Sequence, residues 1–165
     1  MQMRSALMIL LTIAVLAALP AVGESAGRGA PEPWATVNAC DTEKRPNQIG
    51  IRGSMPGLER RTRMRMRFRV QYLDSEGDWR TVKPGADSGW RKVAAGRGGE
   101  HNAGWTFWFK PPTAGGAHVL RGAVSYQWRA GGRAVRRERR VTEAGHPGTV
   151  GAEPADFSAE TCAIA

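Results

Sequence analysis

Apolar and charged side chains alternate without a break through residues 62–72. One set comprises Met64, Met66, Phe68, Val70 and Tyr72, and the other comprises Arg63, Arg65, Arg67, Arg69 and Gln71. A period of two indicates a β-strand with one buried and one solvated face. A helix would spread the arginines around its whole circumference. The pattern therefore predicts a central strand with a core on one side and a row of positive charge on the other.

Shorter alternating or apolar runs fill most of the remaining chain, and Gly, Pro and Asp separate them. We expect strands at 34–40, 47–54, 78–82, 89–93, 105–109, 118–129, 133–142 and 156–164. The Gly-rich stretch 94–103 is expected to be a mobile loop, and Gly131-Gly132 a hairpin turn. Eight or nine short strands without a convincing 3.6-residue period predict an all-β fold, a single antiparallel β-sandwich. Its core is expected to hold Trp34, Trp79, Trp90, Trp105 and Trp128.

The N-terminus has the pattern of a secretory signal peptide over residues 1–23. Arg4 supplies the positive start, residues 6–18 are apolar, and 21–23 are small. An uncleaved membrane anchor is the alternative, although the apolar run is short for a span of about 20 residues. Residues 24–33 are small, polar and rich in Pro and Gly, as expected for a flexible linker. The sandwich domain would then occupy 34–165 of a secreted, extracellular or cell-envelope protein without a stable membrane span.

The chain has two cysteines, Cys40 and Cys162, near the two ends of the predicted domain. Export makes a disulfide between them plausible, because oxidising compartments preserve such bonds. The bond would join the first strand to the last. From chain entropy alone, closing so long a loop would stabilise the fold by at most about 4–5 kcal/mol.

The strand spacing, the Trp-rich middle and the run Leu120–Trp128 before a Gly-Gly hairpin together resemble immunoglobulin-like and fibronectin type III-like domains. More loosely, residues 34–164 resemble small exported bacterial proteins with one such domain. The resemblance implies a recognition, adhesion or spacer role and carries over no functional residue. One departure is that antibody-type domains bridge their two sheets in mid-core, whereas these cysteines lie at the ends of the domain.

The formal net charge of +9 comes almost entirely from arginine, since only Lys44, Lys83, Lys92 and Lys110 are lysines. Of the twenty arginines that remain from 24 Lys+Arg, twelve lie in 60–69 and 129–140. One explanation is a polyanionic partner: an acidic polysaccharide, another polyanion such as a nucleic acid, or an anionic lipid. The other is a solvated surface with arginine favoured by GC-rich coding.

If the strand at 62–73 and the hairpin at 119–142 share a sheet, their arginines share its outer face. We predict an anion-binding face of Arg63, Arg65, Arg67, Arg69, Arg121 and Arg129, with part of the 133–140 cluster. Such binding would be salt-sensitive and of low specificity. Trp108 alternates away from Phe107 and Phe109, so we expect an exposed ring that joins this anion-binding face and stacks on sugars or bases beside the arginines.

No pattern indicates catalysis. His101, His118 and His146 have no metal-ligand spacing, Ser54 lacks the Gly-x-Ser-x-Gly context, and no phosphate-binding loop is present. Residues 74–78 are acidic but too short for a known calcium loop. We therefore predict no cofactor, no metal and a non-catalytic recognition or structural module. The alternatives are a small extracellular hydrolase with acids or histidines paired only in space, and a domain that binds a protein partner through its loops.

Overall fold

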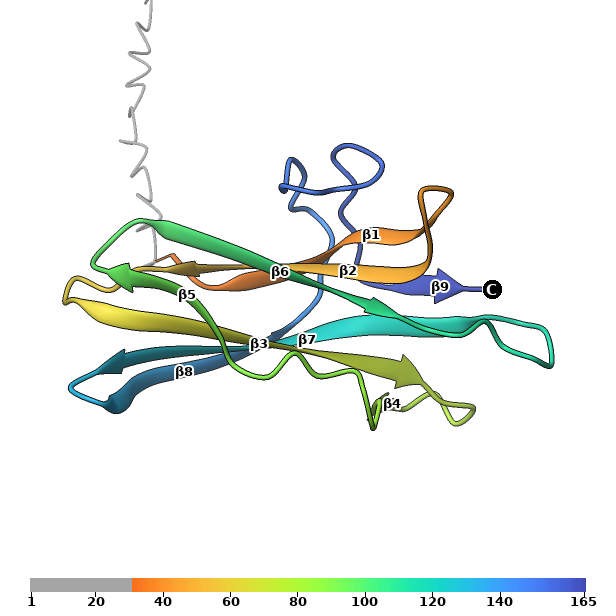
Figure 1. Ribbon diagram of the computed structural model, residues 1–165, viewed down its shortest axis with the longest axis horizontal. Coiled ribbons are helices and arrows are strands. Elements are labelled where there is room, and N and C mark those ends of the chain that lie inside the picture. Colours follow the sequence, from red (N-terminus) through yellow and green to blue (C-terminus); the bar gives the residue numbers. More distant parts are fainter. Residues whose placement is uncertain (1–30) are drawn as a thin grey trace, which may run out of the picture.

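The computed structural model describes residues 31–165, which form nine β-strands in two antiparallel sheets packed as a sandwich (Figure 1). This confirms the predicted all-β sandwich. The predicted signal peptide and most of the predicted linker lie outside the described residues. Within residues 31–165, no helix is long and apolar enough to cross a membrane.

The smaller sheet has three strands, in the order β1-β2-β6, and the larger sheet has six, with the path β4-β3-β7-β8. β5 also pairs with β3, and β9 with β7. The strands are β1 (Trp34–Thr42), β2 (Arg45–Pro56), β3 (Thr62–Leu73), β4 (Trp79–Thr81), β5 (Arg91–Gly96), β6 (Glu100–Trp108), β7 (His118–Ala130), β8 (Arg133–Val141) and β9 (Cys162–Ile164). The alternating strand β3 therefore lies in the interior of the larger sheet, as its pattern predicts.

The core forms where the inner faces of β3 and β7, neighbours in the larger sheet, pack against β1 and β2 of the smaller sheet. Met64, Met66, Phe68 and Val70 are all fully buried, and Trp128 is the largest side chain packed with them. The Trp128 Nε1–H donates to the Pro56 carbonyl at 2.7 Å, which satisfies the polar atom of this buried ring. Because the apolar residues of β3 are buried between the two sheets, the arginines that alternate with them point outward.

A disulfide joins Cys40 in β1 to Cys162 in β9, with Cα atoms 5.3 Å apart. β1 belongs to the smaller sheet and β9 to the larger, so the bond links the two layers. The predicted pairing is confirmed. The predicted last strand, 156–164, is shorter than expected and contains only Cys162–Ile164.

The Gly-rich stretch 94–103 is not a mobile loop. β5 continues to Gly96 and β6 starts at Glu100, and a three-residue connection between them crosses from one sheet to the other. Gly98 and Gly99 make this tight crossing possible because both have positive φ, at 60° and 73°. These two glycines therefore reflect the backbone conformation of the β5–β6 connection, not flexibility of the stretch.

The prediction of five core tryptophans is wrong for Trp34, Trp79 and Trp90, whereas Trp105 is partly buried and packs against the core. Only Trp128 is fully buried, whereas Trp90 is 39% exposed and Trp34, Trp79 and Trp105 are half-buried. Two of the half-buried rings lie under arginine: the guanidinium carbon of Arg91 lies 4.0 Å from the Trp105 ring centroid, and that of Arg121 lies 4.2 Å from the Trp79 ring centroid. These rings serve as platforms for cations at the sheet edges.

A candidate anion-binding face

The outer face of the larger sheet collects positive charge from four strands. On β3, Arg63, Arg65, Arg67 and Arg69 point away from the core, because the alternate residues are buried. Antiparallel pairing places Arg129 of β7 opposite Arg63, and Arg121 of β7 opposite Gln71. All six arginines predicted from the sequence therefore lie on one sheet face, while their role in binding stays a prediction.

Three further cations join this face through strand register. Lys92 of β5 lies opposite Arg65, and Arg137 and Arg139 of β8 lie opposite Gln127 and Ser125 of β7. We define the arginine face as Arg63, Arg65, Arg67, Arg69, Lys92, Arg121, Arg129, Arg137 and Arg139. Arg137 and Arg139 are the members of the 133–140 cluster that lie on this face; the sequence did not specify which members would do so. Lys92 was not predicted, and only the pairing of β5 with β3 reveals it.

One carboxylate enters the arginine face. Asp87 Oδ1 accepts from Arg67 Nε at 2.8 Å, and Asp87 Oδ2 accepts from the same nitrogen at 3.0 Å. The hydrogen bond from Arg67 lowers the pKa of Asp87 and raises the pKa of Arg67. Arg67 is the one member of the face that forms an ion pair within residues 31–165.

Neutral groups hold two other members in place. The Arg69 Nη2 donates to Ser125 Oγ at 3.2 Å, and its buried Nε has no partner among the described residues. Arg121 Nε donates to Gln71 Oε1 at 3.0 Å while its guanidinium stacks on Trp79. Burial lowers the pKa of both arginines, and neighbouring Arg139 and Arg67 lower that of Arg69 further. These side chains are oriented by neutral groups. Asp87 near Arg69 and Glu160 near Arg121 act in the opposite direction and raise the pKa, but neither acid forms an ion pair with these arginines.

Trp108 does not share a surface with the arginine face. It lies on β6 in the smaller sheet, on the side opposite buried Phe107, and is 69% exposed. The ring borders a separate hollow of about 480 Å³ with Arg45 and Arg52. Stacking by Trp108 would therefore serve a second surface, on the other side of the sandwich.

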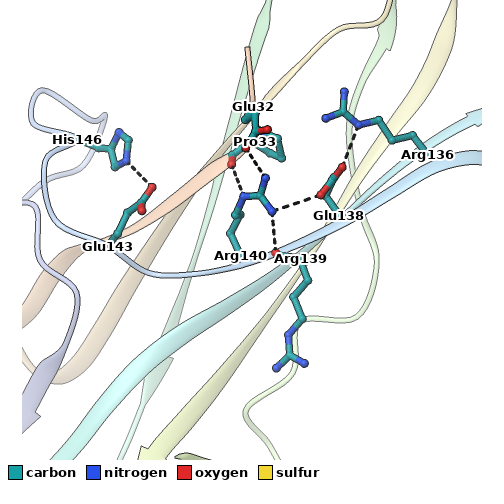
Figure 2. Close-up of polar contacts among 8 residues, drawn as sticks. All are labelled: Glu32, Pro33, Arg136, Glu138, Arg139, Arg140, Glu143 and His146. Carbon is teal, nitrogen blue, oxygen red and sulfur yellow. Dashed lines mark hydrogen bonds and ion pairs between the residues drawn. The ribbon is translucent and has the colours of Figure 1, made fainter. Parts of the chain in front are cut away.

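The histidines lie in separate local settings. His101 Nε2 is 3.0 Å from the Gly98 carbonyl oxygen, at the β5–β6 connection, and His118 begins β7 on the surface. His146 stacks on Trp34, with ring centroids 4.1 Å apart, and its Nε2 lies 3.0 Å from Glu143 Oε1. Figure 2 shows the contact between His146 and Glu143. These positions do not bring the histidines together into one acid–base pair or metal site.

Among the described residues, the one group of carboxylates close enough to hold a metal ion is Asp74, Glu76 and Asp78, after β3. Arg80 pairs with all three, with N–O distances of 2.8, 3.7 and 3.0 Å respectively. Asp74 also accepts from the backbone N–H of Asp78 at 2.8 Å, and its bond with Arg80 lowers its pKa. The three carboxylates thus surround the guanidinium of Arg80, which supplies the positive charge at this turn.

No protein-family description matches this chain, and no curated protein is significantly similar to it.

Proposed function

We propose that this protein is an exported, non-catalytic recognition module that binds an anionic polymer through the arginine face. The observation that carries the proposal is nine cations on one sheet surface with a single carboxylate, Asp87, among them. Binding would release condensed counterions, so affinity should fall steeply with salt and depend little on polymer sequence. An acidic polysaccharide is the partner class that suits an extracellular protein.

Two features agree with an exported protein that has an immunoglobulin-like or fibronectin type III-like fold. The chain crosses repeatedly between a three-stranded and a six-stranded sheet, in the manner of a Greek-key sandwich. This arrangement agrees with an immunoglobulin-like or fibronectin type III-like domain, which the sequence resembles. The disulfide agrees with residence in an oxidising compartment, as does the signal peptide expected over residues 1–23.

Heparin, a sulfated polysaccharide, is a suitable probe of the proposal. The test variant is Arg65→Ser/Arg137→Ser, which removes two cations that flank Gln127 on the face. The matched control is Lys44→Ser/Lys110→Ser, which removes the same charge from exposed positions next to strands of the smaller sheet.

The face variant is expected to elute from a heparin column at clearly lower salt than the wild type, and the control variant close to it. The slope of log affinity against log salt should also fall by about 2 for the face variant. Equal shifts for the two variants would mean that net charge alone sets retention, and the proposal would be wrong.

A further inference from the structure

One end of the arginine face is hollowed. The hollow has a volume of about 830 Å³, within the range of small-molecule sites, and lies between the start of β3, β5 and the β7–β8 turn. Figure 1 shows these three parts at the same end of the sandwich. Its charged lining consists of Arg61, Arg63, Arg65, Lys92 and Arg129, and no carboxylate of residues 31–165 lines it.

Strand register places like charges directly opposite each other in this hollow. Arg63 pairs with Arg129 across β3 and β7, and Arg65 pairs with Lys92 across β3 and β5. Like charges in directly opposed positions destabilise a sheet. The two pairs are neighbours along β3, so their repulsion is concentrated in one place. A bound anion would relieve it.

The hollow also has a fixed cation at its rim. Arg129 donates through Nη2 to the Gly132 carbonyl and through Nη1 to Gln127 Oε1 at 3.4 Å. Gly131 and Gly132 both have positive φ, at 54° and 77°, which allows the tight turn that brings this carbonyl close. Both acceptors are neutral, so they orient the guanidinium without compensating its charge.

The opposite end of the face differs. There Arg67 is neutralised by Asp87, Arg69 donates to Ser125, and Arg121 covers Trp79. That end can attract a polymer, but its side chains already have partners. The uncompensated charge of the face is therefore greatest at the hollow.

We propose that this hollow binds a tetrahedral oxyanion, a sulfate or phosphate group, carried by the polymer. Guanidinium groups suit such anions because their N–H donors form a planar fork that engages two oxygens at once. Cations from β3, β5 and β7 approach from different sides, which suits a tetrahedral group better than a planar carboxylate. This inference rests on the proposed function and assigns its anchoring point.

The experiment compares two pairs of substitutions on the same face, each removing two charges. Arg63→Ser/Arg129→Ser, the hollow variant, removes one opposed pair of cations from the hollow. Arg137→Ser/Arg139→Ser, the β8 variant, removes two cations that lie on the face but outside the hollow. Affinity for heparin is measured at fixed salt, with the thermal midpoint of each protein recorded with and without heparin.

The hollow variant is expected to lose at least tenfold in affinity, and the β8 variant about two- to threefold. Without heparin, the hollow variant should melt at a higher temperature than the wild type, because the opposed charges are gone. This rise also shows that the variant folds. The stabilisation by heparin seen with the wild type should largely disappear in the hollow variant.

The outcomes separate this inference from the proposed function. Equal losses for the two variants would overturn the hollow as anchor while leaving the face as a diffuse binding surface. If neither variant differs from the Lys44→Ser/Lys110→Ser control, the face itself is not a binding surface. Polygalacturonate, which carries only carboxylates, should bind more weakly than heparin or polyphosphate at equal charge density, and equal binding would contradict a tetrahedral site. Heparin and polyphosphate then distinguish sulfate from phosphate.

Discussion

The arginines on the two sides of β8 differ in whether they have carboxylate partners. On the side toward the core, Glu138 lies between Arg136 and Arg140 and contacts a nitrogen of each at 3.3 Å. Arg140 also donates to Glu32 at 2.7 Å and to the Pro33 carbonyl at 3.1 Å. Arg139, on the other side, points away from this group (Figure 2). Within residues 31–165, neither Arg139 nor Arg137 has a carboxylate partner.

The difference separates arginines that hold the fold together from arginines that do not. Arg140 ties the segment before β1 to β8, and the half-buried Arg136 lies over the Trp128 ring with its guanidinium carbon 4.7 Å from the centroid. Arg80 is likewise surrounded by three acids at its turn. Arg140 and Arg80, which tie separate parts of the chain together, are thus each paired with carboxylates. The arginine face lacks them, apart from Asp87, which is the arrangement expected of a surface whose acids come from a ligand.

The largest expected effect on stability comes from removing the acid of the neutralised side. Glu138→Gln leaves Arg136 and Arg140, each two residues from position 138, without a shared carboxylate. We expect the free energy of unfolding to fall by about 1 kcal/mol, as measured by urea denaturation, because two half-buried ion pairs are lost. Heparin affinity should not decrease.

The control for this change is Glu43→Gln, at the exposed β1–β2 turn, which should alter stability much less. If both substitutions destabilise the protein equally, Glu138 has no special role and the two sides of β8 do not differ as described.

A smaller effect of opposite sign is expected from adding an acid to the other side. Gln127 lies between Arg65 and Arg137, and its Oε1 already accepts from Arg129. Gln127→Glu should stabilise the free protein by about 0.5 kcal/mol through cross-strand attraction. It should also weaken heparin binding several-fold, because the new carboxylate competes with the polymer for the same cations.

Gln127→Glu is expected to raise stability while it lowers heparin affinity. A folding defect would instead lower both. A variant that is less stable and binds heparin as the wild type does would contradict the account of the face. Gln48→Glu, on β2 of the smaller sheet, adds the same charge elsewhere and should leave heparin affinity nearly unchanged.

The smallest expected effect is that of the acid already on the face. Asp87→Asn frees Arg67, so heparin affinity should rise slightly, while the free energy of unfolding falls by a few tenths of a kcal/mol near neutral pH. Because Arg67 lowers the pKa of Asp87, the ion pair stabilises the fold above the unfolded-state pKa of about 3.9. That stability is lost as the pH falls through the lower, folded-state pKa.

Urea denaturation of the wild type and Asp87→Asn across pH 2–7 checks this expectation. The two stability curves should be separated near neutral pH and should converge at the acidic end. A separation that stays constant down to pH 2 would show that ionised Asp87 is not the source of the difference.

Some of these features follow from the sequence because they depend on local alternation. The outward row Arg63, Arg65, Arg67 and Arg69 is fixed by a side-chain period of two and by the buried residues between them. The disulfide follows from having two cysteines at the ends of a domain expected to be exported. Both inferences need only one strand or one pairing.

The orientation of β8 could not be predicted in this way. Regular pairing from the Gly131-Gly132 turn would place Arg136 opposite Gln127 and Glu138 opposite Ser125, on the outer face. A bulge between Trp128 and Arg129 shifts the register by one residue, so that Arg137 and Arg139 take those places. One extra residue thus decides which side of the strand receives the acid, and nothing in the run Arg133–Val141 reveals it.

Long-range pairing accounts for the other differences. Lys92 reaches the face because β5 pairs with the first half of β3, beyond β4 on the same edge. Trp108 leaves the face because β6 pairs with β2 in the smaller sheet. Both outcomes depend on which sheet a short strand joins, which alternation within the strand does not specify.

The central claim is that the arginines of this face are arranged for a polymer. The most direct measurement compares the salt concentration at which the oxidised wild-type protein elutes from heparin and from a sulfonate cation exchanger of matched charge density. The account predicts elution from heparin at clearly higher salt, because a polyanion can engage the opposed pairs and the rows beside them together. Elution from both columns at the same salt would contradict it, since the charge would then act only as a solvated surface.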